Sequence, residues 1–150
     1  MKKIILTLLT FVFLTACGYT PIYSTKNFDF KLSEINIAQN DQLSSKLKRE
    51  LQIFSNEESQ KIISLKLDVQ KKINTLSKNS KGDASRYEMI IDIKLEATNN
   101  QQENTRQSFQ ERFNYNANKN KFELNQYKKE IEDLLIKKNI DQIIIYLSKI

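Results

Sequence analysis

The side chains that could do chemistry are few in this chain of 150 residues. It has one cysteine, Cys17, and no histidine. Ser-His-Asp and Cys-His catalytic sites and most zinc sites need an imidazole, so the composition excludes these classes of site. The two glycines, Gly18 and Gly82, are too few for a glycine-rich phosphate-binding loop. The thiol of Cys17 is therefore the first group whose chemistry needs an explanation.

Cys17 follows a segment that is typical of a secretory signal peptide. A cationic start, Met1-Lys2-Lys3, precedes the almost wholly apolar residues 4–16. This run is shorter than the roughly 20 residues that a membrane-spanning helix needs. The junction Leu14-Thr15-Ala16-Cys17 resembles the bacterial lipobox. The resemblance implies cleavage after Ala16, transfer of a diacylglycerol to the Cys17 sulfur, and acylation of the new N-terminus by a fatty acid such as palmitate.

The alternative for Cys17 is a buried structural cysteine that happens to follow a signal. A lone thiol in an exported protein has no partner for a disulfide, which favours lipidation. Two or more acyl chains hold a protein firmly on a membrane. Gly18 stands where some bacteria have an Asp that retains lipoproteins at the inner membrane, so we expect the periplasmic side of the outer membrane.

The chain is long enough for one folded domain with one core. We predict a signal peptide over 1–16, a lipidated tether over 17–31 and a single domain over 32–150. Loss of Lys2 and Lys3 with the leader lowers the formal net charge from +6 to +4. This excess suits anionic lipid headgroups or lipopolysaccharide phosphates as well as simple solubility. We expect no nucleic-acid partner and no cofactor other than the lipid on Cys17.

Hydrophobic periodicity predicts four strands and two helices. The first strand is expected over 32–38, where the alternation slips at Ser33-Glu34 and indicates either a bulge or a strand that starts near Leu32. A helix over 41–54 follows from the spacing of Leu43, Leu47, Leu51 and Phe54. Three further strands are expected from Ile63, over 86–97 and over 109–115, with a loop over 77–83, and a last helix is expected over 123–148.

This order predicts an α/β (α+β) two-layer sandwich with the sequence β-α-β-β-β-α. The helix between the first two strands favours a parallel crossover, and the short links among the later strands favour antiparallel neighbours. A mixed four-stranded sheet with both helices on one face buries every apolar stripe. The other face is then polar, with Lys66, Asp68, Gln70, Arg86, Glu88, Lys94, Glu96 and Arg112.

Two regions leave alternatives open. Glu111 falls on the apolar side of the fourth strand, where a carboxylate needs a partner or an edge position. The last helix has a predicted inward set of Tyr127, Ile131, Leu134, Leu135, Ile140, Ile143, Ile144 and Leu147, and Lys137-Lys138-Asn139 could mark a kink. Ile145 and Tyr146 widen its apolar surface, which indicates burial by a partner or by the end of the sheet.

The start Cys17-Gly18-Tyr19-Thr20-Pro21-Ile22-Tyr23 resembles the mature start of the lipopolysaccharide-assembly lipoprotein family LptE, which often reads Cys-Gly-aromatic-x-Pro-aliphatic-Tyr. The predicted element order also matches that family's fold. The resemblance implies a protein that is not an enzyme. It implies a plug inside the outer-membrane barrel LptD, which supports assembly of that barrel and assists lipopolysaccharide transport to the outer leaflet.

On this resemblance, five basic residues around the 77–83 loop are candidates for contacts with lipopolysaccharide phosphates. They are Lys71, Lys72, Lys78, Lys81 and Arg86. The alternative is that they are ordinary solvated side chains. The loops are more polar and richer in Asn than is usual for the family, which leaves individual loop contacts open.

Two other functions remain open from the sequence. One is a different small lipoprotein, such as a pilotin-like or transport-accessory module. The other is an enzyme that acts on envelope lipids or glycans through paired carboxylates, either Glu88 with Glu96 or Glu111 with Glu123. Neither pair has a diagnostic spacing.

Overall fold

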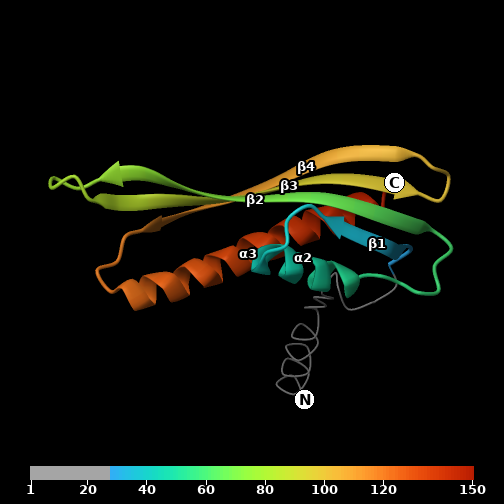
Figure 1. Cartoon of the computed structure of the whole chain (residues 1–150), viewed down its shortest axis with the longest axis horizontal. Coiled ribbons are helices and arrows are strands. Elements are labelled where there is room, and N and C mark those ends of the chain that lie inside the picture. The colour runs from blue at the N-terminus through green and yellow to red at the C-terminus, as the bar shows by residue number, and fades with distance from the viewer. Residues whose placement is uncertain (1–27) are drawn as a thin grey trace, which may run out of the picture.

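The computed structural model describes residues 28–150. Its elements are β1 (Lys31–Ile37), α2 (Gln42–Gln52), β2 (Ile62–Lys78), β3 (Ala84–Asn99), β4 (Asn104–Asn116) and α3 (Lys121–Leu147). A sheet forms one layer and the two helices lie against one face of it (Figure 1). The two-layer α/β sandwich and its element order confirm the predicted fold. The predicted leader, Cys17 and the chain up to residue 27 lie outside the described residues.

The sheet is mixed, with the strand order β1-β2-β3-β4. β1 and β2 are parallel, because α2 carries the chain back between them. β2 with β3, and β3 with β4, are antiparallel and are joined by short turns. Both kinds of pairing agree with the link lengths that the sequence predicted.

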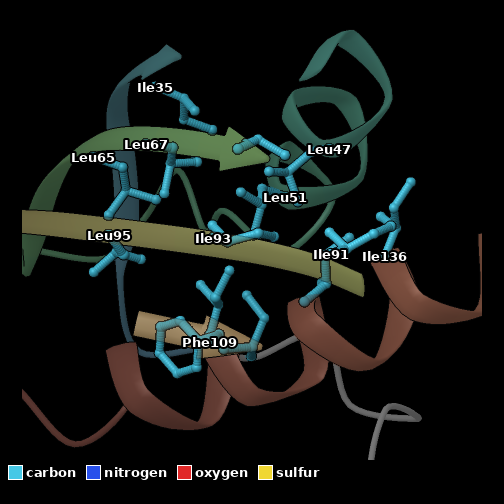
Figure 2. Close-up of a cluster of buried hydrophobic side chains, with 14 of the residues drawn as sticks. Ile35, Leu47, Leu51, Leu65, Leu67, Ile91, Ile93, Leu95, Phe109 and Ile136 are labelled. Atoms are coloured by element: carbon cyan, nitrogen blue, oxygen red, sulfur yellow. The ribbon is translucent and has the colours of Figure 1, made fainter. Parts of the chain in front are cut away.

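The core lies between the sheet and the helices. Leu65 and Leu67 of β2 and Ile91 and Ile93 of β3 alternate toward the helices and are almost fully buried. Figure 2 shows this cluster together with Leu47 and Leu51 of α2, Ile136 of α3, and Ile35, Leu95 and Phe109. Burial of one such side chain contributes about 1.5–3 kcal/mol. The helix-facing stripe of the sheet therefore fixes where both helices lie.

β1 contains the bulge that the alternation indicated. Leu32 pairs with Ile63 and Glu34 pairs with Ser64, so Ser33 is the extra residue. The bulge turns the later side chains over, which lets both Leu32 and Ile35 reach the core despite their odd spacing.

α2 begins at a side-chain cap. Asp41 Oδ1 accepts the N–H of Ser44 at 2.8 Å, and this bond holds the pKa of Asp41 below its ordinary value. Leu43, Leu47 and Leu51 are buried on one face, as predicted.

α3 differs from its prediction in which residues face inward. Tyr127 and Leu134 were predicted to be buried, but they are 43% and 41% exposed. Ile136 and Asn139 are buried instead. Asn139 Nδ2 donates to the carbonyl oxygens of Leu135 at 3.0 Å and of Ile91 at 3.4 Å, whereas its Oδ1 is buried with no hydrogen-bond partner among residues 28–150. The helix continues through 137–139 without a break.

β2 is longer than predicted. The sequence indicated a loop from Ser77, but the ladder with β3 continues to the pair of Lys78 with Ala84. Every residue over 71–78 is exposed, so hydrophobic periodicity carries no signal there. Backbone pairing with β3 maintains the strand, together with polar contacts of Lys71 with Glu132 and of Ser77 with Ser85. We call residues 71–91 the β2–β3 ribbon. Its turn projects beyond the start of α3 in Figure 1.

The two turns of the sheet share one hydrogen-bond pattern. Asn79 Oδ1 accepts the N–H groups two and four residues later, both at 2.9 Å. Asn99 Oδ1 does the same, both at 3.0 Å. Each turn has one left-handed residue, Gly82 with φ 86° and Gln102 with φ 62°. Glycine adopts this conformation freely, whereas Gln102 holds it under strain.

The shared geometry predicts opposite effects for two substitutions. Gln102→Gly removes backbone strain of about 1–2 kcal/mol, and the greater entropy of glycine in the unfolded chain offsets part of this gain. The free energy of unfolding should therefore rise by about 0.5 kcal/mol. Gly82→Ala should lower it by about 1 kcal/mol. Urea unfolding of each variant measures both effects. A loss of stability in Gln102→Gly would contradict this account of the turn.

Candidate functional site

The face of the sheet opposite the helices carries rows of facing polar side chains. Lys66 lies opposite Glu96, which in turn lies opposite Arg106. In the next row, Asp68 lies opposite Lys94. Opposite charges on neighbouring strands attract each other, so the rows stabilise a sheet face that contacts water. We call this side the outer face, and its polarity agrees with the alternation in the sequence.

Glu96 is the most connected carboxylate of the outer face. Its Oε1 accepts Asn104 Nδ2 at 2.6 Å and an Arg106 guanidinium nitrogen at 3.3 Å. The hydrogen bond from Asn104, followed by that from Arg106, holds the pKa of Glu96 below its ordinary value. Two further carboxylates have partners, since Asp92 accepts Ser108 Oγ at 2.9 Å and Glu88 lies 3.9 Å from Arg112.

A shallow hollow of about 510 Å³ lies over this face. Its charged and hydroxyl side chains are Lys66, Asp68, Lys94, Glu96, Arg106 and Ser108. The sequence analysis assigned the first four to this face and missed Arg106 and Ser108. Counting the alternation back from Phe109 would have found both, but residues 104–108 contain no apolar side chain to mark a face.

The structure divides the five basic candidates between the two sides of the sheet. Lys71 lies on the helix side, where its Nζ is 2.7 Å from Glu132 Oε2 of α3. Lys72 lies on the outer face, opposite Ile90. Lys78 ends β2, Lys81 lies in the turn, and Arg86 pairs with Ser77 near the turn.

We call Lys72, Lys78, Lys81 and Arg86 the ribbon cations. All four are exposed, and none of their side chains forms an ion pair with any residue of 28–150. Lys72 and Lys78 are six residues apart on one strand, about 20 Å, so the set forms a strip rather than a pocket. Ile73 and Leu76 lie on the same segment and are each 46% exposed. Ile73 pairs with the buried Met89 and so lies on the helix side, whereas Lys72 lies on the outer face. The ribbon thus exposes both cations and apolar groups, and an anionic amphiphile that wraps around it could contact both.

The carboxylate pairs proposed for an enzyme do not converge. Glu88 and Glu96 are eight residues apart on β3, about 27 Å. Glu111 accepts a hydrogen bond from Gln142, near the end of α3, whereas Glu123 lies in the first turn of α3 and accepts one from Asn120. Residues 123 and 142 are about 28 Å apart along the helix axis. Glycoside hydrolysis needs two carboxyl groups within about 5–9.5 Å. These two pairs therefore cannot act in that way.

Glu111 has both features that its position requires. It lies on β4, an edge strand of the sheet, and is half-buried. Its Oε1 accepts Gln142 Nε2 of α3 at 2.6 Å. Its contact is therefore structural, between the edge strand and the last helix.

Two negative findings apply to the described part of the chain. Among residues 28–150, no group of three or more Cys, Asp or Glu side chains is placed to hold a metal ion. Neither described helix is long and apolar enough to cross a membrane.

Comparisons with known proteins give a shared fold. No protein-family model matches the sequence, and no curated protein matches it. A solution structure of an uncharacterized lipoprotein B from Nitrosomonas europaea has a TM-score of 0.59 and 15% identity, over 81% of this chain and 83% of that one. A crystal structure of the rare lipoprotein B from Shewanella oneidensis has a TM-score of 0.57 and 13% identity, over 77% and 94%.

A third similar structure is a minor lipoprotein from Acinetobacter baumannii. It has a TM-score of 0.55 and 15% identity, over 81% of this chain and 92% of that one. At such identities the likeness shows the fold alone. All three structures are described as lipoproteins, and the match spans most of each.

The hydrogen bonds of Glu96 generate a pH prediction. Because the pKa of Glu96 is lower in the folded protein than in the unfolded chain, the ionised carboxylate stabilises the fold. This stabilisation is complete at pH values above the unfolded pKa, about 4.3 for glutamate, and is lost as the pH falls through the folded pKa. Asn104→Ala and Arg106→Gln should each raise the pKa of Glu96, because each removes a group that stabilises the carboxylate. NMR titration of the Glu96 carboxyl carbon checks this, and an unchanged pKa in both variants would contradict it.

Proposed function

We propose that this chain is an outer-membrane lipoprotein of the LptE type. In this proposal Cys17 carries the diacylglycerol and the N-acyl lipid, and the domain lies on the periplasmic side. It plugs the LptD barrel, supports assembly of that barrel and assists lipopolysaccharide insertion.

The combination of two observations carries the proposal. The domain has the fold of lipoproteins described as lipoprotein B, and in this sequence the domain follows a lipobox and a start that resembles the LptE family. The two observations are independent, because the described residues begin at 28 and the motif ends at Tyr23. A role in binding and support needs no catalytic group, and neither proposed carboxylate pair converges.

The outer face suits the lumen of a large barrel, which is hydrated. Its carboxylates bond neighbouring side chains of the sheet, so the face needs no partner to satisfy them. In contrast, the ribbon cations have no ion pair within residues 28–150, and the exposed side chains of Ile73 and Leu76 accompany them. We propose that this strip contacts the phosphates and acyl chains of lipopolysaccharide in transit.

Co-purification tests the plug. The protein, tagged at its C-terminus and extracted from membranes in mild detergent, should bring down one large barrel protein in about equal amounts, identified by mass spectrometry. Recovery of the protein without a barrel, or with a soluble transport component in its place, would contradict the plug and favour an accessory lipoprotein.

The ribbon cations predict a charge-dependent interaction. Changing all four to Gln should weaken binding of purified lipopolysaccharide about tenfold, because exposed charge pairs contribute about 0.2–1 kcal/mol each. Added salt should weaken the unmodified protein in the same way. Surface plasmon resonance with immobilised lipopolysaccharide measures both effects.

The matched control removes four exposed cations from the helix side, with Gln at Lys48, Arg49, Lys129 and Lys138. This variant has the same net charge as the ribbon variant and should bind nearly as well as the unmodified protein. Equal losses in the two variants would show attraction by overall charge and would contradict a site on the ribbon.

A further inference from the structure

A groove of about 570 Å³ lies between the end of α2 and α3. Its apolar lining comes from Phe28, Ile53, Phe54 and Ile140, and its charged lining comes from Glu50, Lys137 and Asp141. Ile53 is the C-cap residue of α2 and is 65% exposed, although α2 buries its other large apolar side chains. Glu50 already lies 3.8 Å from Lys46 Nζ, and Lys137 adds one positive charge to the lining. The groove therefore suits mainly an apolar segment, and Asp141 can accept one further cation.

The chain before β1 already packs along this end of α2. The N–H of Leu32 donates to Ser55 Oγ at 2.9 Å, and the carbonyl of Phe30 accepts the N–H of Asn56 at 2.9 Å. The rings of Phe28 and Phe54 lie edge to face with centroids 5.2 Å apart. Followed backward from Leu32 to Phe28, the chain therefore runs along the loop after α2 and reaches the wall of the groove.

The residues that precede Phe28 match the lining of the groove. Ile22 and Tyr23 are apolar, and Lys26 is the one cation of residues 18–27. Tyr23 is five residues from Phe28, so its Cα lies within about 18 Å of the groove wall whatever path the chain takes. A segment held this close has an effective concentration in the millimolar range, which favours it over a separate partner.

We propose that Ile22 and Tyr23 dock in this groove, with Lys26 beside Asp141. The occupant is the chain's own tether. In the test below, cross-links between chains would indicate a second copy, and equal rates for the two cysteine pairs would leave the groove open to a partner protein. Docking attaches the tether to the helix side of the domain.

The consequence for orientation rests on the proposed lipid anchor. Once Ile22 and Tyr23 are docked, only residues 18–21 separate the groove from Cys17, so the Cα atoms of Cys17 and Ile22 are at most about 18 Å apart. The helix side would then be held next to the membrane surface, and the ribbon would keep a fixed position relative to the anchor. The docking itself requires neither the lipid nor a barrel.

Disulfide trapping tests the docking in the mature chain, residues 17–150. Cys17→Ser removes the only native thiol. Tyr23→Cys combined with Ile53→Cys should then cross-link within one chain under mild oxidation. The control combines Tyr23→Cys with Lys48→Cys, an exposed position of α2 outside the groove. We expect the groove pair to react about tenfold faster, because docking raises the effective concentration of its two thiols.

Equal rates for the two pairs would overturn the proposal, and so would cross-linking between chains, which would indicate a second copy in the groove. A second measurement avoids cysteine altogether. Ile22→Ser with Tyr23→Ser should lower the urea midpoint of unfolding, whereas Ser24→Ala with Thr25→Ala should leave it unchanged. No shift in the first pair would also overturn the docking. Neither assay contains lipid or barrel, so a negative result leaves the proposed function standing.

Discussion

The structure depends on burial of the sheet on one face only. Leu65, Leu67, Ile91 and Ile93 face the helices and are almost fully buried, so the residues between them must face water. This constraint explains the facing charges of the outer face and the hydrogen bonds of Glu96. It also explains why β2 can continue beyond the core with exposed side chains over 71–78, because its backbone pairs with β3 up to the turn. A one-sided sheet thus presents a hydrated face and a projecting ribbon.

Much of the fold was predictable because the buried stripes are regular. The element order follows from the alternation of apolar residues over β2 and β3 and from the leucine spacing of α2. The break in the alternation at Ser33 corresponds to a bulge in β1. α3 was less predictable, since it has apolar residues on several sides and buries Asn139 through two hydrogen bonds. The five basic candidates were predicted as one group because the sequence of an exposed strand does not show which side chains face which side of the sheet. Adjacent in sequence, Lys71 and Lys72 lie on opposite faces of the sheet.

The proposed function joins three parts of the molecule. The lipid on Cys17 would hold the chain at the outer membrane, and the docked tether would set how the domain faces that membrane. The ribbon then extends the cations Lys72, Lys78, Lys81 and Arg86 away from the core, where they have no ion pair within residues 28–150. In this proposal each part performs binding or positioning.

The central claim is that this protein supports delivery of lipopolysaccharide to the cell surface. Depletion of the protein from the parent bacterium, followed by measurement of surface-exposed lipopolysaccharide by labelling of intact cells, tests the claim most directly. We predict that surface lipopolysaccharide falls, that newly made lipopolysaccharide accumulates inside the outer membrane, and that re-expression restores delivery. Undiminished surface lipopolysaccharide after depletion would contradict the claim.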